Sequence, residues 1–307
     1  MNKRTIRADG FLLLTSCIWG FAFVAQRSGM EYVGPFMFNG IRFILGSFSL
    51  LPLIMVRKAR LESNKPESMP ASTRAETRAW IGPSLLAGTC LFIAASLQQI
   101  GIIYTTAGHS GFITGLYVVL VPIFGIGLKR KTGLPTWIGA VCTLTGLFFL
   151  STAGNMSTIN LGDGITAVGA IFWAFHVLVI DRLVQKVDPL ILSAGQFAWC
   201  GICSLVLAYV GTESFSLGAM VQGLVPILYS GLGSVGIAYT LQVVAQQDAP
   251  PAHATIILCL EGVFAAIGGC LILAEPLGPW TLVGFTCMFC GMVATQWEVI
   301  AGLAKAS

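Results

Sequence analysis

A single carboxylate within a long apolar run is the strongest candidate for chemistry in this sequence. The run, residues 252–269, reads AHATIILCLEGVFAAIGG and is long enough to cross a bilayer, with His253 near its start and Glu261 near its middle. A carboxylate at that depth costs about 3 kcal/mol on insertion scales, so it usually faces a partner, water or a substrate. Two interpretations stay open: a structural carboxyl bonded to a neighbouring helix, or a proton acceptor or contact for a substrate amine.

Other polar and aromatic side chains within apolar runs form a second group of candidates. The guanidinium of Arg42 suits a substrate carboxylate, although such an arginine also reaches the interface or the carbonyls of a neighbouring helix. Trp173 and His176, three residues apart, share a helical face that suits stacking and a polar contact. Trp19 and Tyr239 would add aromatic surface, and packing between helices is the alternative role of both tryptophans.

The sequence contains none of the common catalytic motifs. There is no G-x-x-x-x-G-K-[ST], no H-E-x-x-H and no G-x-S-x-G, and the three histidines fall in three different apolar runs. All nine cysteines lie in apolar runs, which argues against a disulfide framework, and the C-x-x-C of Cys200 and Cys203 has no second pair to complete a zinc site. We therefore expect no catalytic residue, no metal and no cofactor.

The composition predicts where these side chains lie. The 307 residues are 55% hydrophobic and only 10% charged, and the mean hydropathy is +0.83, whereas roughly 25% of the residues of a soluble domain are charged. This composition predicts a multi-pass protein of the lipid bilayer. The net charge of +4 is not concentrated in a footprint for nucleic acid, so we expect no nucleic-acid partner.

The apolar runs predict about ten membrane-spanning helices. Each has the roughly fifteen to twenty-five residues that a tilted span requires. The first run is interpreted as a span and not as a removable signal peptide, because no small-residue cleavage site with a soluble domain follows it. The predicted spans are residues 11–25, 35–56, 79–103, 107–128, 135–152, 165–181, 189–211, 223–246, 251–274 and 278–297.

The basic residues predict the orientation of these spans. With the N-terminus inside, fifteen of the seventeen Lys and Arg residues fall in the loops and tails of one side; Arg27 lies on the other side and Arg42 within a span. Because short cytoplasmic loops are enriched in Lys and Arg, this bias predicts that both termini are cytoplasmic.

The chain contains two copies of one pattern. A shift of 154 residues superposes Trp19 on Trp173, and a shift of 144 superposes Gln98 on Gln242. The difference, 154 minus 144 residues, falls at the long polar loop 57–78, where an insertion is tolerated. The two glutamine amides suit either a ligand or the joining of two helices.

Residues 1–155 and 156–307 thus form two five-helix repeats of one compact transmembrane domain. Because five is odd, the two copies lie upside down relative to each other. Inverted repeats are typical of secondary transporters, whose substrate site lies near mid-membrane between the halves. The predicted fold is all-α and integral to the membrane, with about ten transmembrane helices in two inverted five-helix repeats.

The shift of 144 residues also pairs positions with unequal chemistry. His109 coincides with His253, and the inversion places them at the outer and cytoplasmic ends of the bundle. We consider them gate candidates at the two mouths of one pathway; the alternative is that each caps the start of a helix. Tyr117 coincides with Glu261, so the carboxylate is not duplicated.

Several motifs together resemble the EamA-type branch of the drug/metabolite transporter superfamily. They are IWGFAFV (18–24), PFMFNGIRF (35–43), LEGVFAAIGG (260–269) and AEPL (274–277). The family often has proline after the glutamate, where this chain has Gly262. The resemblance implies a ten-helix carrier of the bacterial inner membrane, commonly an exporter, with its cavity among predicted helices 1, 3, 4, 6, 8 and 9.

We therefore expect a secondary transporter of small organic solutes, amino acids or related metabolites, that works by alternating access through a central cavity. Proton-coupled and facilitative transport both stay open. The expected partners are the solute, the bilayer and, in the coupled case, protons, and the assembly is a monomer or a homodimer. The alternative is an intramembrane enzyme that acts on a lipid-linked substrate, with Glu261 and a histidine as acid and base. A non-transporting scaffold is disfavoured by the polar interior.

Overall fold

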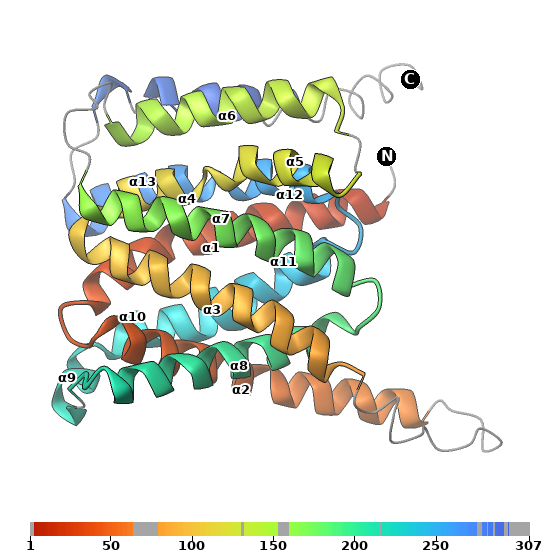
Figure 1. The fold of residues 1–307 in the computed structure, drawn as a ribbon, viewed down its shortest axis with the longest axis vertical. Coiled ribbons are helices and arrows are strands. Elements are labelled where there is room, and N and C mark those ends of the chain that lie inside the picture. Colours follow the sequence, from red (N-terminus) through yellow and green to blue (C-terminus); the bar gives the residue numbers. More distant parts are fainter. Residues whose placement is uncertain are drawn as a thin grey trace.

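The structure, a computed structural model, is helical throughout its described residues, with no strand among them (Figure 1). It describes residues 3–63, 79–129, 132–152, 160–214, 216–274, 278–280, 282–284, 286–291 and 294. Within these residues, eight helical segments are long and apolar enough to cross a membrane. The prediction of an all-α fold is thereby confirmed for the described residues.

The first half of the chain begins with three long helices and then becomes shorter and more broken. Its second helix continues to Ser63 and so enters the stretch 57–78 that the sequence predicts to be a polar loop. The helices are α1 (Lys3–Gly29), α2 (Pro35–Ser63), α3 (Ile81–Tyr104), α4 (Ala107–Thr114), α5 (Tyr117–Gly127) and α6 (Leu134–Thr152).

The second half has two long helices followed by a span of mixed type and a broken span. The mixed span contains η2, an eleven-residue stretch of π-helix. The last predicted span, residues 278–297, falls partly outside the described residues. The elements are α7 (Leu161–Leu183), α8 (Pro189–Val210), α9 (Leu217–Gln222), α10 (Leu224–Leu228), η2 (Tyr229–Tyr239), α11 (Thr240–Ala245), α12 (Pro251–Leu258) and α13 (Glu261–Leu273).

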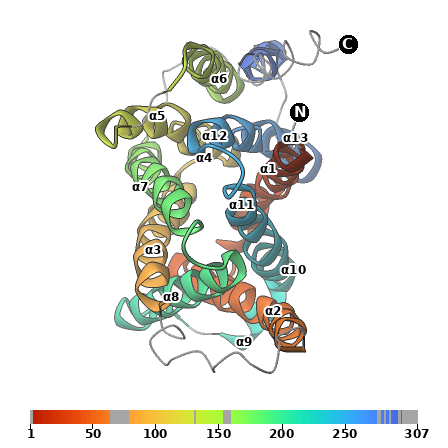
Figure 2. The ribbon, with the colours of Figure 1, turned by 90° about the vertical axis from the view of Figure 1, so that its right-hand side faces the viewer.

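Helices from the two halves are interleaved around the middle of the bundle. Seen end-on, α1, α2, α3, α7, α8, the α10–α11 span and the two broken spans surround the centre, whereas α6 lies outside them (Figure 2). The most extensive helix contacts join α3 to α7 and α2 to α8, one helix from each half. Neither half therefore forms a core of its own.

Glycine allows α1 to approach α13 closely. A Cβ atom on Gly20 would lie 2.7 Å from the carbonyl oxygen of Glu261 and 2.8 Å from the backbone nitrogen of Ala265, and closer still to the side chain of Phe264. Membrane helices pack through such small residues because lipid supplies no hydrophobic force to drive them together. Gly20 thus sets the distance between α1 and the start of α13.

Polar groups fix the two ends of the α2–α8 pair. At one end, both oxygens of Glu213 accept backbone N–H bonds at the start of α2, from Phe36 at 3.1 Å and Met37 at 2.7 Å. An anion at a helix N-terminus is favoured by the unsatisfied N–H groups and by the helix dipole. At the other end, Arg57 pairs with Asp188 at 2.9 Å, and Asp188 also caps α8.

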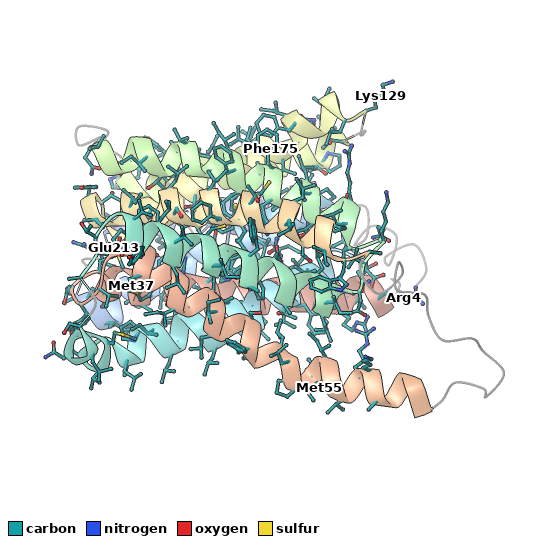
Figure 3. The ribbon with its side chains drawn as sticks, turned by 60° about the horizontal axis from the view of Figure 1, so that its bottom comes forward. Arg4, Met37, Met55, Lys129, Phe175 and Glu213 are labelled. Carbon is teal, nitrogen blue, oxygen red and sulfur yellow. The ribbon has the colours of Figure 1, made fainter. Side chains whose placement is uncertain are left out.

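The labelled side chains distinguish these ends. Glu213 and Met37 lie together at one end of the bundle, and Arg4 and Lys129 lie at the opposite end (Figure 3). We call the end with Arg4 and Lys129 the basic end.

Substitution of Gly20 by Ala should separate α1 from α13. The added Cβ meets backbone atoms that cannot rotate away, and overpacking of this kind costs about 1–3 kcal/mol. We expect a lower midpoint of thermal unfolding for the purified protein in detergent. Gly10→Ala, in the same helix with nothing within 4 Å of its added Cβ, should leave the midpoint unchanged or raise it slightly. Equal midpoints for the two variants would contradict the close packing described.

Candidate functional site

In two spans that the sequence predicts to be continuous, the α-helical hydrogen bonding is interrupted at matching positions, although the backbone dihedral angles of Leu116 and Leu260 stay right-handed helical. Residues 107–128 divide into α4 and α5, and residues 251–274 divide into α12 and α13. At the interruptions the backbone tightens: Leu116 N–H bonds Ile113 O at 3.1 Å, and Leu260 N–H bonds Ile257 O at 3.1 Å. These i→i−3 bonds are of the 3₁₀ type, which often marks hinges within helices.

The interruptions bring Tyr117 and Glu261 together. Each is the first residue of the half-helix after its break, α5 and α13 respectively. The hydroxyl of Tyr117 lies 3.0 Å from Oε1 of Glu261, and the two residues are 4% and 3% exposed. A second contact crosses between the breaks, since Cys259 Sγ lies 3.4 Å from Gly115 O. The positions that the 144-residue shift superposes are thus in direct contact.

This pair belongs to the wall of a small cavity in the middle of the bundle. The cavity measures about 30 Å³, room for about two water molecules. Its lining comes from both halves of the chain and consists of Trp19, Phe23, Gln26, Gln98, Thr114, Tyr117, Trp173, Val177, Ser234, Tyr239, Gln242, Leu258 and Glu261.

Most of the lining residues occur as pairs related by the two shifts found in the sequence. Ten of the thirteen form five such pairs, in which the side chain is sometimes kept and sometimes changed. The pairs are Trp19 with Trp173, Phe23 with Val177, Gln98 with Gln242, Thr114 with Leu258, and Tyr117 with Glu261. The cavity therefore lies where equivalent faces of the two halves meet.

The two cavity tryptophans are fixed by hydrogen bonds at their indole nitrogens. Trp173 Nε1 donates to Gln98 Oε1 at 2.7 Å, and Trp19 Nε1 donates to the carbonyl oxygen of Ser234 at 3.4 Å. Tyr239 lies between them, with ring centroids 4.5 Å from Trp19 and 5.9 Å from Trp173. Three aromatic rings thus form one continuous wall.

The polar part of the wall presents unused hydrogen-bond acceptors. Gln246 donates from Nε2 to the carbonyl oxygen of Val177 at 3.1 Å, so its Oε1 accepts from Gln242 Nε2 at 3.0 Å. This order leaves Gln242 Oε1 buried without a hydrogen-bond donor in the described part of the chain, as are Gln26 Oε1 and the Thr114 hydroxyl. Buried polar atoms of this kind usually meet water or a ligand.

Two predicted site residues lie behind the wall instead of in it. Arg42 is 2% exposed, and its guanidinium carbon lies 4.9 Å and 5.6 Å from the ring centroids of Phe43 and Phe38. Phe43 in turn packs 6.0 Å from Tyr239, so Arg42 lies one layer outside the cavity.

His176 also supports the wall from behind. Its Nε2 lies 2.9 Å from Gln196 Oε1, and its ring meets Trp173 edge-on, 5.9 Å between centroids. Gln196 occupies the position that matches Arg42 in the other repeat. The other predicted contacts, Trp19, Gln98, Tyr117, Trp173, Tyr239 and Glu261, all line the cavity.

Of the two gate candidates, His253 lies away from this lining. His253, near the start of α12, lies 2.8 Å from the carboxylate of Asp9 near the start of α1, with both side chains partly buried. Arg7 and Asp248 approach to 3.8 Å next to them. The backbone of His109 belongs to α4, but its side chain falls outside the described residues.

Three polar residues of the lining, Thr114, Ser234 and Gln26, were not predicted from the sequence. Thr114 is three residues from Tyr117 on the same helical face, so extension of that face would have found it. Ser234 lies five residues from Tyr239, which α-helical spacing places on another face; the i→i+5 bonding of η2 aligns the two. Gln26 has no polar counterpart, since the 154-residue shift gives Ile180.

Comparison with known proteins agrees with this architecture. The model of the EamA-like transporter family matches the chain twice, over residues 6–152 and 160–296. An uncharacterized transporter of Archaeoglobus fulgidus is 27% identical over 90% of this chain and 81% of its own length. The uncharacterized inner membrane transporter YedA of Escherichia coli is 26% identical over 90% of this chain and 86% of its own.

A solved crystal structure shares the fold. It covers 95% of this chain and 96% of its own, with a TM-score of 0.76 and 15% sequence identity. Because the family model spans most of the sequence in two copies, the chain is a multi-pass membrane protein that belongs to the EamA-like transporter family.

Proposed function

We propose that this protein is a secondary transporter that moves small organic solutes by alternating access through the central cavity. The observation that carries the proposal is the construction of the cavity from matched positions of both halves, at the breaks of two spans. Carriers built from inverted repeats bind their substrate at such discontinuous helices. An enzyme acting through Glu261 and a histidine is less well supported, because no histidine is among the described side chains that line the cavity.

The two repeats are residues 1–155 and 156–307, folded as one transmembrane domain. The double match of the family model supports this division, and so do the two breaks, which fall 144 residues apart at Tyr117 and Glu261. With five spans in each repeat, the second copy is inverted in the membrane.

Access to the cavity requires the spans to move. A volume of about 30 Å³ accommodates water but not an amino acid. The 3₁₀ turns at Gly115–Leu116 and Cys259–Leu260 supply hinges, so that the half-helices on either side change direction. The α2–α8 pair, tied at one end by Glu213 and at the other by Arg57 and Asp188, forms the stationary frame.

The contacts of α1 with the start of α12 close the basic end. The His253–Asp9 and Arg7–Asp248 contacts must separate before solute passes there. By the positive-inside rule we assign this end to the cytoplasm and, since ten spans bring the chain back to the side on which it starts, both termini as well; the carrier would then lie in the inner membrane of a bacterial cell.

Replacement of Glu261 by Gln tests proton coupling. Glu261 is the only carboxyl among the described side chains of the cavity, and the titratable groups around it are Tyr117, Tyr239 and Cys259. In counterflow of labelled amino acids and metabolites into proteoliposomes, the variant should lose the response to an imposed proton gradient. Its flux should fall at least about tenfold, the effect of losing one charge-assisted contact. A gradient response that survives in the variant rules out coupling through Glu261.

Removal of the Tyr117 hydroxyl tests the contact between the two breaks. Tyr117→Phe leaves a buried carboxyl oxygen without its donor, which costs about 1–3 kcal/mol, and should lower both the unfolding midpoint and the flux. Tyr229→Phe is the matched control: it removes a hydroxyl that donates to Ile18 O at 3.0 Å outside the cavity. The control should affect stability alone. If both variants transport equally well, the Tyr117–Glu261 contact has no part in transport.

Cysteine substitution tests the gate positions. Cysteines introduced singly at His109 and His253 should react with membrane-impermeant maleimide from opposite sides of the membrane, because the inversion places them at opposite mouths. The unsubstituted protein, with its nine native cysteines, gives the background. Labelling of both positions from the same side contradicts the gate assignment and the inverted arrangement together.

A further inference from the structure

We propose that the cavity, once the movement of the spans has widened it, selects compact organic cations, namely primary or secondary ammonium groups carried on a small apolar or aromatic body. The inference rests on the proposed function, in that it names the class of solute for the same cavity. It follows from three independent features of the wall: its charge, its aromatic faces and its unused acceptors.

The charge of the wall matches a cation and not an anion. Glu261 is its one carboxyl, and no Lys, Arg or His is among the described side chains that line it. Arg42 is not among these lining residues: its guanidinium lies one layer behind the wall, against the rings of Phe43 and Phe38, and reaches the wall only electrostatically, through Tyr239. Glu261 lies in the first turn of α13, where the helix dipole favours an ionised carboxylate. An ammonium group bound beside Glu261 would stabilise that ionised form, whereas a ligand carboxylate would destabilise it.

The aromatic wall adds a second attraction for a cation. The rings of Trp19, Tyr239 and Trp173 form a continuous surface, and the face of an aromatic ring carries partial negative charge. Both indole N–H groups are already bonded, to Ser234 and to Gln98, so neither is needed by a ligand. Only the π faces of the two indole rings are therefore available to a ligand.

The unused polar atoms of the cavity select for a hydrogen-bond donor. The chain of bonds from Gln242 through Gln246 to the carbonyl of Val177 fixes Gln242 with its amide oxygen unpaired. Gln26 also presents an unpaired amide oxygen. Amide oxygens only accept, so they pair with the N–H groups of an ammonium and gain nothing from a carboxylate. This feature favours a primary or secondary ammonium over a quaternary one.

A set of matched ligands tests the inference on the unmodified, full-length protein. Phenethylamine, L-phenylalanine and 2-phenylethanol share one aromatic body; the second adds a carboxylate to the amine, and the third replaces the ammonium by a neutral hydroxyl. Binding is followed by the fluorescence of the cavity tryptophans in detergent at pH 7, and transport by counterflow in proteoliposomes. Phenethylamine should bind at least about tenfold more tightly than either of the others, about 1.4 kcal/mol, which lies within the range of a desolvated cation–π contact.

Two variants identify the groups responsible. Glu261→Gln should remove the preference for phenethylamine over 2-phenylethanol, whereas Glu31→Gln, which removes an exposed carboxylate outside the cavity, should keep it. The comparison among the three ligands needs no variant, so a Glu261→Gln protein that fails to fold does not weaken the test.

The outcomes separate this inference from the proposed function. L-phenylalanine or 2-phenylethanol binding as tightly as phenethylamine overturns the cation inference, and so does a preference that persists in Glu261→Gln. Flux of phenylalanine or of a neutral solute without flux or binding of the amine also overturns it, while transport itself stands. Selective binding of the amine with no flux of any ligand supports the cation site and contradicts the transporter.

Discussion

The hydrogen bond between Tyr117 and Glu261 is the constraint on which the centre of the molecule depends. A carboxyl group at this depth requires a partner, and the partner is the residue at its own matched position in the other repeat. The contact is possible because both spans are interrupted just before these residues, so that α5 and α13 begin facing each other. The same residues therefore mark the interruptions of the two spans, line the cavity and join the two halves.

Glycine brings α1 close to this contact, which lies within a large cluster of buried apolar side chains. Gly20 brings α1 against the carbonyl of Glu261 itself, so the position of the carboxyl depends on α1 as well as on α5. The aromatic wall then closes the remaining side, held by Gln98 and Ser234. Behind it, His176 and Arg42 pack against Trp173 and Phe43, which keeps the wall in place without entering it.

The sequence predicted the membrane class, most spans and six of the thirteen cavity residues, because burial in lipid imposes long apolar runs in which polar residues stand out. Trp19, Trp173 and Glu261 were found this way, and all line the cavity. Arg42 and His176 were also predicted because they are polar residues within apolar runs, but they lie one layer behind the cavity wall. Polarity within a span does not reveal which face of the helix is turned to the cavity. The helix breaks and η2 had no comparable signal: neither contains a proline at the turn, and hydropathy is the same for α-, π- and 3₁₀-helices.

In the carrier that we propose, the unequal pairs in the wall would give a symmetric scaffold its preference for one solute. Alternating access needs two end states of similar free energy, and two inverted copies of one repeat would provide them because each opening would resemble the other turned over. Equal pairs such as Trp19 with Trp173 present the same surface in both states. Tyr117 and Glu261 do not, and in the proposed carrier they would contact the solute at the centre of the bundle whichever end is open. Residues at the centre would select the solute equally from either side of the membrane. The relative free energy of the two end states would then depend on the equal pairs of the two repeats.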